Sequence, residues 1–233
     1  MSILQVSERI IKENFCTLEE KTNKNISHNE SNLYYNDNLV YKIFKPVFRL
    51  DKEKNMYLIY GKKFPFANNI VDKLYQGEKL IGITCDYLEN FISMYDYMNS
   101  LQLYDIKIIM SELLLFHKRT IESNLIYWDN HLNNMGMSQN KFYIVDIDSM
   151  TKITNKNDVY FALNGLLALF YEMYYKIPIR NIYDNYRGII SLLSENENYT
   201  SCQLTLNDIK RILDNSTVDY LESKRKVLDL KKI

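Results

Sequence analysis

The chain has 233 residues, of which 46% are hydrophobic and 25% are charged. This length and composition are typical of a globular protein that buries a sizeable core, as one larger domain or as two closely packed lobes. The 29 basic and 29 acidic side chains cancel to a net charge of zero. There is thus no global electrostatic argument for nucleic acid or an anionic membrane, and neither is expected as a partner.

The cysteines and the apolar segments bear on compartment and membrane. Cys16, Cys85 and Cys202 are widely spaced and odd in number, so they predict neither a disulfide framework nor a zinc site and favour a reducing compartment such as the cytoplasm. Residues 1–15 lack a long apolar run, so no cleavable secretory signal is expected. The most apolar segment, 161–175, is interrupted by polar residues and is shorter than the ~20 residues of a membrane span, which predicts a buried helix.

The first part of the chain has a β-like pattern after a short helix. Apolar spacing predicts an amphipathic helix within 1–15, strands at 14–19, 32–35 and 39–44, and a polar loop at 21–30. Asn36-Asp37-Asn38 suits a hairpin turn, because Asn and Asp tolerate positive φ. Lys42 lies inside the strongly apolar strand 39–44. Burying a lysine there is costly unless an anion pairs with it.

Later segments alternate between strand-like and helical patterns. Leu50 to Tyr60 predicts a helix that carries Glu53 in its first half. Apolar runs predict strands at 70–71 and 79–84, followed by a linker at 86–90. Residues 101–120 repeat apolar side chains at three- and four-residue intervals, a strong helical signal, and Asp158 is placed to cap the apolar helix after it. Helices are also expected at 181–193 and 206–213, before a charged tail at 216–233 that can be helical.

Residues 128–150 contain a group of acids and amides that suits phosphate chemistry. Asp129 is followed five residues later by Asn134, and a predicted β-hairpin then ends in Asp146 and Asp148. Carboxylates are poor strand formers, so an apolar strand at 142–145 that delivers Asp146 is more typical of a ligand site than of a core. A base, an amide and a carboxylate at this spacing can hold a metal-bound phosphate.

The order of these elements resembles the protein kinase-like fold over about residues 15–178. Asp129-Asn130-His131-Leu132-Asn133-Asn134 is similar to the Asp-x-His-x-x-Asn loop of bacterial kinases and antibiotic phosphotransferases. Asp146-Ile147-Asp148 lies where kinases have Asp-Phe-Gly, and Lys156-Asn157-Asp158-Val159-Tyr160 is similar to the opening of their central C-lobe helix. The resemblance implies a two-lobed α+β fold within a single domain: an antiparallel N-lobe sheet with one helix (about 13–85), a hinge (86–90) and a mainly helical C-lobe (91–233).

The same resemblance implies a nucleotide site between the lobes. Lys42 would hold the α- and β-phosphates of ATP, and Glu53 would orient Lys42 through an ion pair. The nucleotide would also be bound by residues of the hinge and of the loop before the strand 32–35, namely Asp86, Leu88 and Ser27.

Catalysis and metal binding would follow from the loop and the strand after it. Asn134 and Asp146 would bind Mg²⁺, a hard cation that prefers oxygen ligands. Asp148 is either a second metal ligand or a turn cap. Asp129 would accept or orient the proton of the substrate hydroxyl, and Asp158 would buttress the catalytic loop.

Two departures from the kinase pattern concern regulation and nucleotide binding. The loop before the strand 32–35 contains no glycine, whereas a Gly-rich loop lets backbone amides approach phosphates, and Ser27 and Ser31 can substitute only in part. Tyr127-Trp128 lies where most kinases regulated by activation-loop phosphorylation have His-Arg, so such regulation is not expected.

A third departure shapes the expected function. Eleven residues separate Asp146 from Asp158, which leaves no room for a long activation segment. This truncation resembles the minimal effector kinases that bacterial pathogens deliver into host cells. The expected function is ATP- and Mg²⁺-dependent phosphorylation of a protein Ser or Thr, in the cytoplasm or on a host protein after delivery into a host cell.

Two alternatives stay open. A small-molecule kinase of the aminoglycoside or choline type would also have the Asp-x-His-x-x-Asn loop and a short segment after Asp146. Such enzymes usually carry an acidic insert, whereas the acids between 181 and 216 are scattered. A nucleotide-binding pseudokinase or interaction module is favoured by the missing glycines, although it has no physical need of Lys42, Asp129, Asn134 and Asp146 together.

Overall fold

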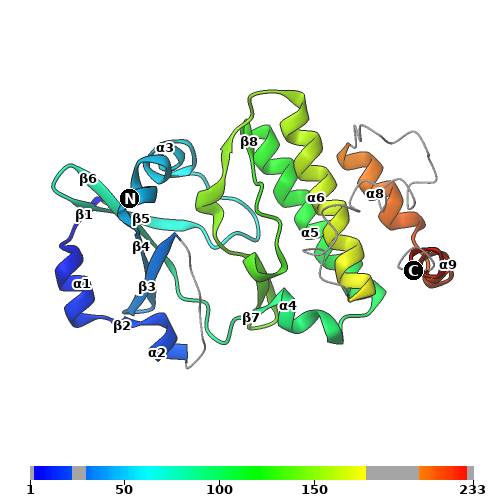
Figure 1. The fold of residues 1–233 in the computed structure, drawn as a ribbon, viewed down its shortest axis with the longest axis horizontal. Helices are drawn as coiled ribbons and strands as arrows, with labels where there is room; N and C mark the ends of the chain where they lie inside the picture. The colour runs from blue at the N-terminus through cyan, green and yellow to red at the C-terminus, as the bar shows by residue number, and fades with distance from the viewer. Residues whose placement is uncertain (1–2, 23–29, 177–204, 230–233) are drawn as a thin grey trace.

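The computed structural model describes residues 3–22, 30–176 and 205–229, which form two lobes (Figure 1). One lobe is a β-sheet with short helices, and the other is mostly helical. The chain passes from the first lobe to the second between the strands β6 (Lys79–Asp86) and β7 (Ile92–Ser93). The two-lobed α+β architecture predicted from the sequence is confirmed.

The first lobe contains most of the strands. In chain order its elements are β1 (Ile3–Gln5), α1 (Glu8–Asn14), β2 (Cys16–Thr17), α2 (Leu18–Thr22), β3 (Ser31–Asn36), β4 (Leu39–Phe44), α3 (Arg49–Ile59), β5 (Ile70–Gln76) and β6. The predicted hairpin turn between β3 and β4 is confirmed, since Asp37 and Asn38 have φ angles of 48° and 62°. Positive φ at both turn residues matches the twist of the flanking strands.

These six strands form one sheet in the order β1-β5-β6-β4-β3-β2. Neighbouring strands are antiparallel except β1 and β5, which are parallel. Within the sheet Lys42 of β4 lies opposite Leu33 of β3 and Ile83 of β6. Lys42 is therefore held from both sides by backbone pairing.

The two faces of the sheet are covered by different helices. On β4, Phe44 belongs to the same buried cluster as Met56 and Ile59 of α3, whereas Ile43 belongs to a cluster that contains Ile11 of α1. Successive side chains of a strand point to opposite faces. Lys42 therefore shares a face with Phe44 and points toward α3.

Gly82 of β6 allows β4 to come close at the position of Lys42. A Cβ at Gly82 would clash with the backbone oxygen of Lys42 and lie 3.2 Å from the Cα of Ile43. We expect Gly82→Ala to lower the free energy of unfolding by about 1–3 kcal/mol in urea titrations. Gly165→Ala in a helix of the second lobe is the matched control, because its Cβ would meet Asn130 at an ordinary 3.6 Å and alanine favours the helix. Equal effects of the two substitutions would contradict this packing.

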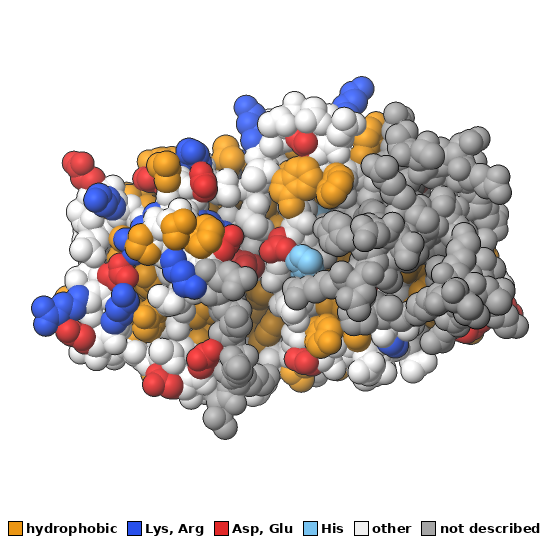
Figure 2. Space-filling model, in the orientation of Figure 1, with side chains coloured by type: hydrophobic (Ala, Val, Ile, Leu, Met, Phe, Trp, Pro, Cys, Tyr) orange, Lys and Arg blue, Asp and Glu red, His pale blue; other side chains and the backbone are white. Residues whose placement is uncertain are grey.

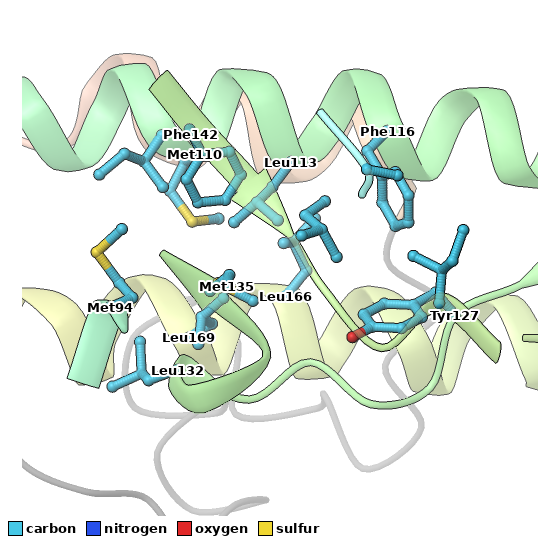
Figure 3. Packing of buried hydrophobic residues seen from close by; sticks show 14 of the residues in the cluster. Met94, Met110, Leu113, Phe116, Tyr127, Leu132, Met135, Phe142, Leu166 and Leu169 are labelled. Carbon is cyan, nitrogen blue, oxygen red and sulfur yellow. The ribbon is translucent and has the colours of Figure 1, made fainter. Parts of the chain in front are cut away.

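The second lobe is built on two long helices. Its elements are β7, α4 (Met94–Tyr97), α5 (Leu103–Glu122), β8 (Leu125–Ile126), β9 (Met135–Ser138), β10 (Lys141–Ile144), β11 (Thr151–Lys152), α6 (Lys156–Tyr175), α8 (Leu206–Asn215) and α9 (Val218–Asp229). Figure 3 shows Leu113 and Phe116 of α5 facing α6, which contributes Leu166 and Leu169 to the same core. This pair of helices supports the loop between β8 and β9, because Asn130 of the loop contacts His117 of α5 and Ala162 of α6.

The helix predicted within residues 1–15 begins later than expected, because β1 precedes α1. β1 pairs in parallel with Lys73–Tyr75 of β5. Such a pairing joins segments that are distant in the chain, so local periodicity does not reveal it.

The strand predicted over 14–19 is shorter than expected and is followed by α2. The backbone N–H of Thr17 donates to Glu20 Oε2 at 2.7 Å, and the N–H of Glu20 donates to Thr17 Oγ1 at 3.2 Å. This reciprocal capping begins a helix after Thr17. The helix predicted at 181–193 lies outside the described residues.

Candidate active site

Lys42 lies between two carboxylates where the lobes meet. Its Nζ donates to Asp146 Oδ1 and, at 2.7 Å, to Asp148 Oδ1. Asp146 follows β10 and has a φ angle of 63°, which turns the chain sharply into the residues that carry Asp148. Aspartate is one of the few residues besides glycine that adopts this left-handed conformation readily.

A second lysine, Lys52 of α3, lies on the other side of Asp148. Its Nζ lies 2.9 Å from Asp148 Oδ2 and 2.6 Å from Glu30 Oε2. We call the five side chains Lys42, Lys52, Glu30, Asp146 and Asp148 the lysine–carboxylate cluster. When all five are ionised, two lysines against three carboxylates leave one net negative charge.

The pKa values within the cluster follow from these contacts. Burial opposes ionisation of Asp148, but Lys42 and Lys52 hold its pKa far below the usual range. Burial also disfavours the ammonium of Lys42, yet Asp148 and Asp146 raise its pKa above the usual value. Burial and the charge of Asp148 raise the pKa of Asp146 to about 7. Asp146 is therefore the carboxylate that would gain most from an additional cation.

Glu53 does not lie where the resemblance placed it. Its negative charge acts on Lys73 and Tyr75 of β5, and the carboxylates that pair with Lys42 within the described ranges are Asp146 and Asp148. Successive residues of an α-helix are rotated by about 100°, so Lys52 and Glu53 cannot both face the same site. The expected pair of Glu53 with Lys42 is replaced by the pair of Asp148 with Lys42.

The loop between β8 and β9 folds back on itself around Asp129. The side chain of Asn134 donates to the backbone oxygen of Asp129 at 3.2 Å, and the N–H of His131 donates to the same oxygen at 2.8 Å. The N–H of Val145 donates to the backbone oxygen of Asn134 at 2.8 Å, which ties the loop to the residue before Asp146. The structure thus brings together Asp129, Asn134 and Asp146. Figure 2 shows acidic side chains beside a histidine at this junction.

Two aromatic residues precede Asp129 and differ in environment. Tyr127 is fully buried, and its hydroxyl donates to the backbone oxygen of Val145 at 3.2 Å. Burial and the charge of Asp129 raise the pKa of Tyr127, which keeps this donor neutral. Trp128 is 38% exposed, donates from Nε1 to Thr151 Oγ1 at 2.6 Å, and packs against the exposed ring of Phe161. Tyr127 supports the loop, and Trp128 forms the surface beside it.

His117 of α5 supports the same loop through a hydrogen bond to Asn130. It is fully buried, its Nε2 lies 2.9 Å from Asn130 Oδ1, and its Nδ1 has no hydrogen-bond partner within the described residues. Since Asn130 Oδ1 can only accept, the neutral ring donates from Nε2. Burial lowers the pKa of His117 to about 4.

This pKa predicts that acid will destabilise the protein through His117. In the unfolded chain a histidine has a pKa near 6.5, so the unfolded state binds the extra proton first and stability falls as the pH drops from about 6.5 toward 4. Between pH 7.5 and 5 the contribution of His117 is a loss of about 2 kcal/mol, while the raised pKa of Asp146 acts in the opposite direction. The Asp146 effect is common to both proteins, so urea unfolding at both pH values should show a change in unfolding free energy that is about 2 kcal/mol less destabilising for His117→Gln than for the wild type. Equal changes would contradict the buried neutral histidine.

Asp158 caps the start of α6 through Thr154 and Asn155 and is not part of the lysine–carboxylate cluster. Its Oδ2 accepts from the backbone N–H and the hydroxyl of Thr154, both at 2.7 Å, and from the N–H of Asn155 at 3.0 Å. These hydrogen bonds lower its pKa. The expected capping role is confirmed, and Asp158 fixes the chain between β11 and α6.

The oxygen donors of the site fit the expected Mg²⁺. The Asn134 amide nitrogen donates to the Asp129 carbonyl, so Asn134 Oδ1 is the end of the amide that can face a cation. The side chain of Asp146 is 25% exposed, whereas that of Asp148 is 1% exposed with each oxygen near a lysine. Within the described ranges no three His, Cys, Asp or Glu side chains could hold a metal by themselves. Proteins usually hold Mg²⁺ with one or two carboxylates plus substrate phosphates, and Asp146 with Asn134 would supply protein oxygens of this kind.

The linker residues Asp86 and Leu88 line a cavity of about 530 Å³. Its walls also contain side chains from both lobes, among them Lys21, Lys63 and Tyr143. Among the described residues these walls do not include Lys42, Asp129 or Asp146, so the cavity is distinct from the lysine–carboxylate cluster. The role of Asp86 and Leu88 in nucleotide binding stays a prediction, and Ser27 lies outside the described residues.

Comparison with solved protein structures identifies the fold of the chain. No protein-family model and no curated protein sequence matches the chain. The solved kinase domain of PknI from Mycobacterium tuberculosis superposes with a TM-score of 0.59 at 12% identity, covering 84% of this chain and 94% of that domain. A cysteine-to-alanine mutant of that domain gives a TM-score of 0.60 at 10% identity, covering 90% and 94%. The chain has the protein kinase-like fold.

Lys52 and Glu30 are the cluster residues that sequence reasoning missed. In α3 the buried positions are Lys52, Met56 and Ile59, a spacing of four and three that marks one helix face. This spacing was the signal that could have identified Lys52, whereas no local pattern points to Glu30.

No helix in the described part of the chain is long and apolar enough to cross a membrane.

Proposed function

We propose that this chain transfers a phosphoryl group from Mg²⁺-bound ATP to a Ser or Thr hydroxyl of a protein. The observation that carries the proposal is the convergence of Lys42, Asp129, Asn134 and Asp146 at the junction of the lobes. They come from three separate segments of the chain. Phosphoryl transfer needs charge neutralisation and alignment of the acceptor, and these four side chains suit both tasks.

Each residue has a distinct role in this proposal. Lys42 would donate to phosphate oxygens from a strand that backbone pairing holds in place. Asp146 and Asn134 would hold Mg²⁺, which supplies a Lewis acid that neutralises phosphate charge. Asp129, with its side chain 35% exposed, would orient the acceptor hydroxyl and take its proton.

The surface beside Asp129 favours a polypeptide as the acceptor. Trp128 and Phe161 expose 38% and 62% of their surface, and their ring centroids lie 6.0 Å apart. An exposed aromatic pair of this kind suits contact with a protein side chain near the acceptor hydroxyl. The free thiols of Cys16 and Cys85 are consistent with action in a reducing compartment. Delivery into a host cell stays a prediction from the effector-kinase resemblance.

Incubation with γ-labelled ATP and a cell lysate, resolved by mass, tests the proposal. We expect label on proteins with the wild type and little label with Asp129→Asn. Label on small metabolites would favour a small-molecule kinase instead. Absence of both label and thermal stabilisation by millimolar Mg²⁺-ATP would favour a binding module.

A further inference from the structure

Asp148 is the most buried member of the lysine–carboxylate cluster, and it contacts both lysines. Its Oδ1 accepts from Lys42 at 2.7 Å, and its Oδ2 lies 2.9 Å from Lys52 Nζ. The contact with Lys52 lacks hydrogen-bond geometry and is an ion pair only. The side chain of Asp148 is 1% exposed. A carboxylate so deeply buried is stable as an anion only because both cations are present.

Lys52 connects Asp148 to helix α3 and to the residue before β3. It projects from the buried face of α3, and it pairs at 2.6 Å with Glu30, the residue before β3. Glu30 is tied to the end of β4, because its backbone oxygen accepts at 2.8 Å from the N–H of Lys45, the residue after that strand. Asn55 of α3 also donates to the backbone oxygen of Asp148, at 3.3 Å. Helix α3, Asp148 and the residue before β3 are thus joined around one lysine.

This arrangement inverts the charge on the helix. In protein kinases an acid on the corresponding helix pairs with the nucleotide lysine, whereas here a lysine occupies the inward position and the acid is supplied from the segment after β10. We propose that Asp148 is the positioning residue that orients Lys42, and that Lys52 holds Asp148 in place. The inference rests on the proposed function, in which Lys42 binds phosphate.

The inverted arrangement also gives Asp146 and Asp148 different roles. Both oxygens of Asp148 are directed at lysines, and a cation there would have to displace one of them. Asp146 has one contact to Lys42 and a partly exposed side chain. Asp148 thus orients Lys42, and Asp146 is the acid that a metal ion can reach.

An exchange of charges tests the proposal: Lys52→Glu, Asp148→Asn and the double variant. Affinity for a non-hydrolysable ATP analogue with Mg²⁺ would be measured by calorimetry, and unfolding in urea without nucleotide. We expect each single variant to bind the analogue at least tenfold more weakly than the wild type. In the double variant a glutamate at position 52 can pair with Lys42, so its affinity should exceed that of either single variant at least fivefold. If the loss of affinity in the double variant equals the product of the losses in the two single variants, the two residues act independently and the proposal is overturned.

Three controls make the result specific. Lys52→Arg keeps the charge and should bind within about threefold of the wild type. Lys54→Glu changes an exposed lysine of the same helix, whose side chain is 66% exposed, and should have no effect. If the single variants fail to fold, Lys52→Met tests the same contact, and wild-type affinity in that variant would overturn the role of Lys52.

The test separates this inference from the proposed function. If the wild type does not bind the analogue, the proposed function fails. The coupling of Asp148 to Lys52 is then judged from the unfolding free energies alone. Non-additive unfolding of the single and double variants would support the pair, and additive unfolding would overturn it.

Discussion

Replacing Asp129 by asparagine should lower the rate of phosphoryl transfer by about 10²–10⁴-fold, the usual contribution of a positioned general base. Asparagine has the shape of aspartate but cannot accept the proton. The loop should keep its fold, because the Asn134 side chain and the backbone N–H of His131 donate to the backbone oxygen of Asp129. The His131 ring, whose Nε2 lies 3.2 Å from Asp129 Oδ1, can still contact the amide oxygen of an asparagine. The affinity for Mg²⁺-ATP should therefore stay within about threefold of the wild type, which separates the rate effect from binding.

Steady-state transfer of labelled phosphate would measure the rate, and calorimetry would measure the affinity. Asp214→Asn is a matched control, since this aspartate is exposed on α8. Unchanged turnover in Asp129→Asn would contradict the assignment of the base. Equal losses in both variants would show that the effect is not specific to the loop.

Replacing Asp146 by asparagine should abolish the effect of Mg²⁺ on nucleotide binding. Removing partners that merely orient a metal ligand typically costs 10–100-fold in metal affinity, so loss of the carboxylate that holds the cation should cost about 100-fold or more. Lys42 would keep its partner Asp148 in this variant. Binding of the nucleotide without metal should therefore change much less than binding with metal.

Calorimetry with a non-hydrolysable ATP analogue, in Mg²⁺ and in EDTA, measures both quantities. We expect the wild type to bind more tightly in Mg²⁺, and Asp146→Asn to bind with similar affinity in both conditions. A variant that retains the full Mg²⁺ effect would refute the metal assignment. Asp158→Asn, at the cap of α6, serves as the control for an altered aspartate outside the site.

Elements with strong local signals could be predicted from the sequence. Strand β4 has the predicted bounds, because an apolar run is bounded by an Asn-Asp-Asn turn and by Pro46. Helix α5 was predicted to within two residues at each end from its apolar periodicity. The acid at the end of the strand 142–145 pointed to Asp146, and the resemblance of residues 129–134 to the Asp-x-His-x-x-Asn loop implied that Asp129 and Asn134 lie near it.

Features that depend on rotation or on distant contacts could not be predicted in the same way. Residues 51–55 of α3 are all polar, and identifying the inward one requires knowing the rotation of the helix. The resemblance favoured Glu53, whereas packing of Met56 and Ile59 turns Lys52 inward. The burial of Asp148 likewise depends on two lysines from other segments of the chain.

The most direct test of the central claim is to locate the nucleotide with an ATP analogue whose terminal phosphate carries a lysine-reactive acyl group. Mass spectrometry would identify the labelled lysine, and excess Mg²⁺-ATP would compete with the label. The proposed site predicts label on Lys42 that Mg²⁺-ATP suppresses. Label on Lys21 or Lys63, which line the separate cavity at the linker, or label on Lys42 that ATP does not suppress, would contradict it.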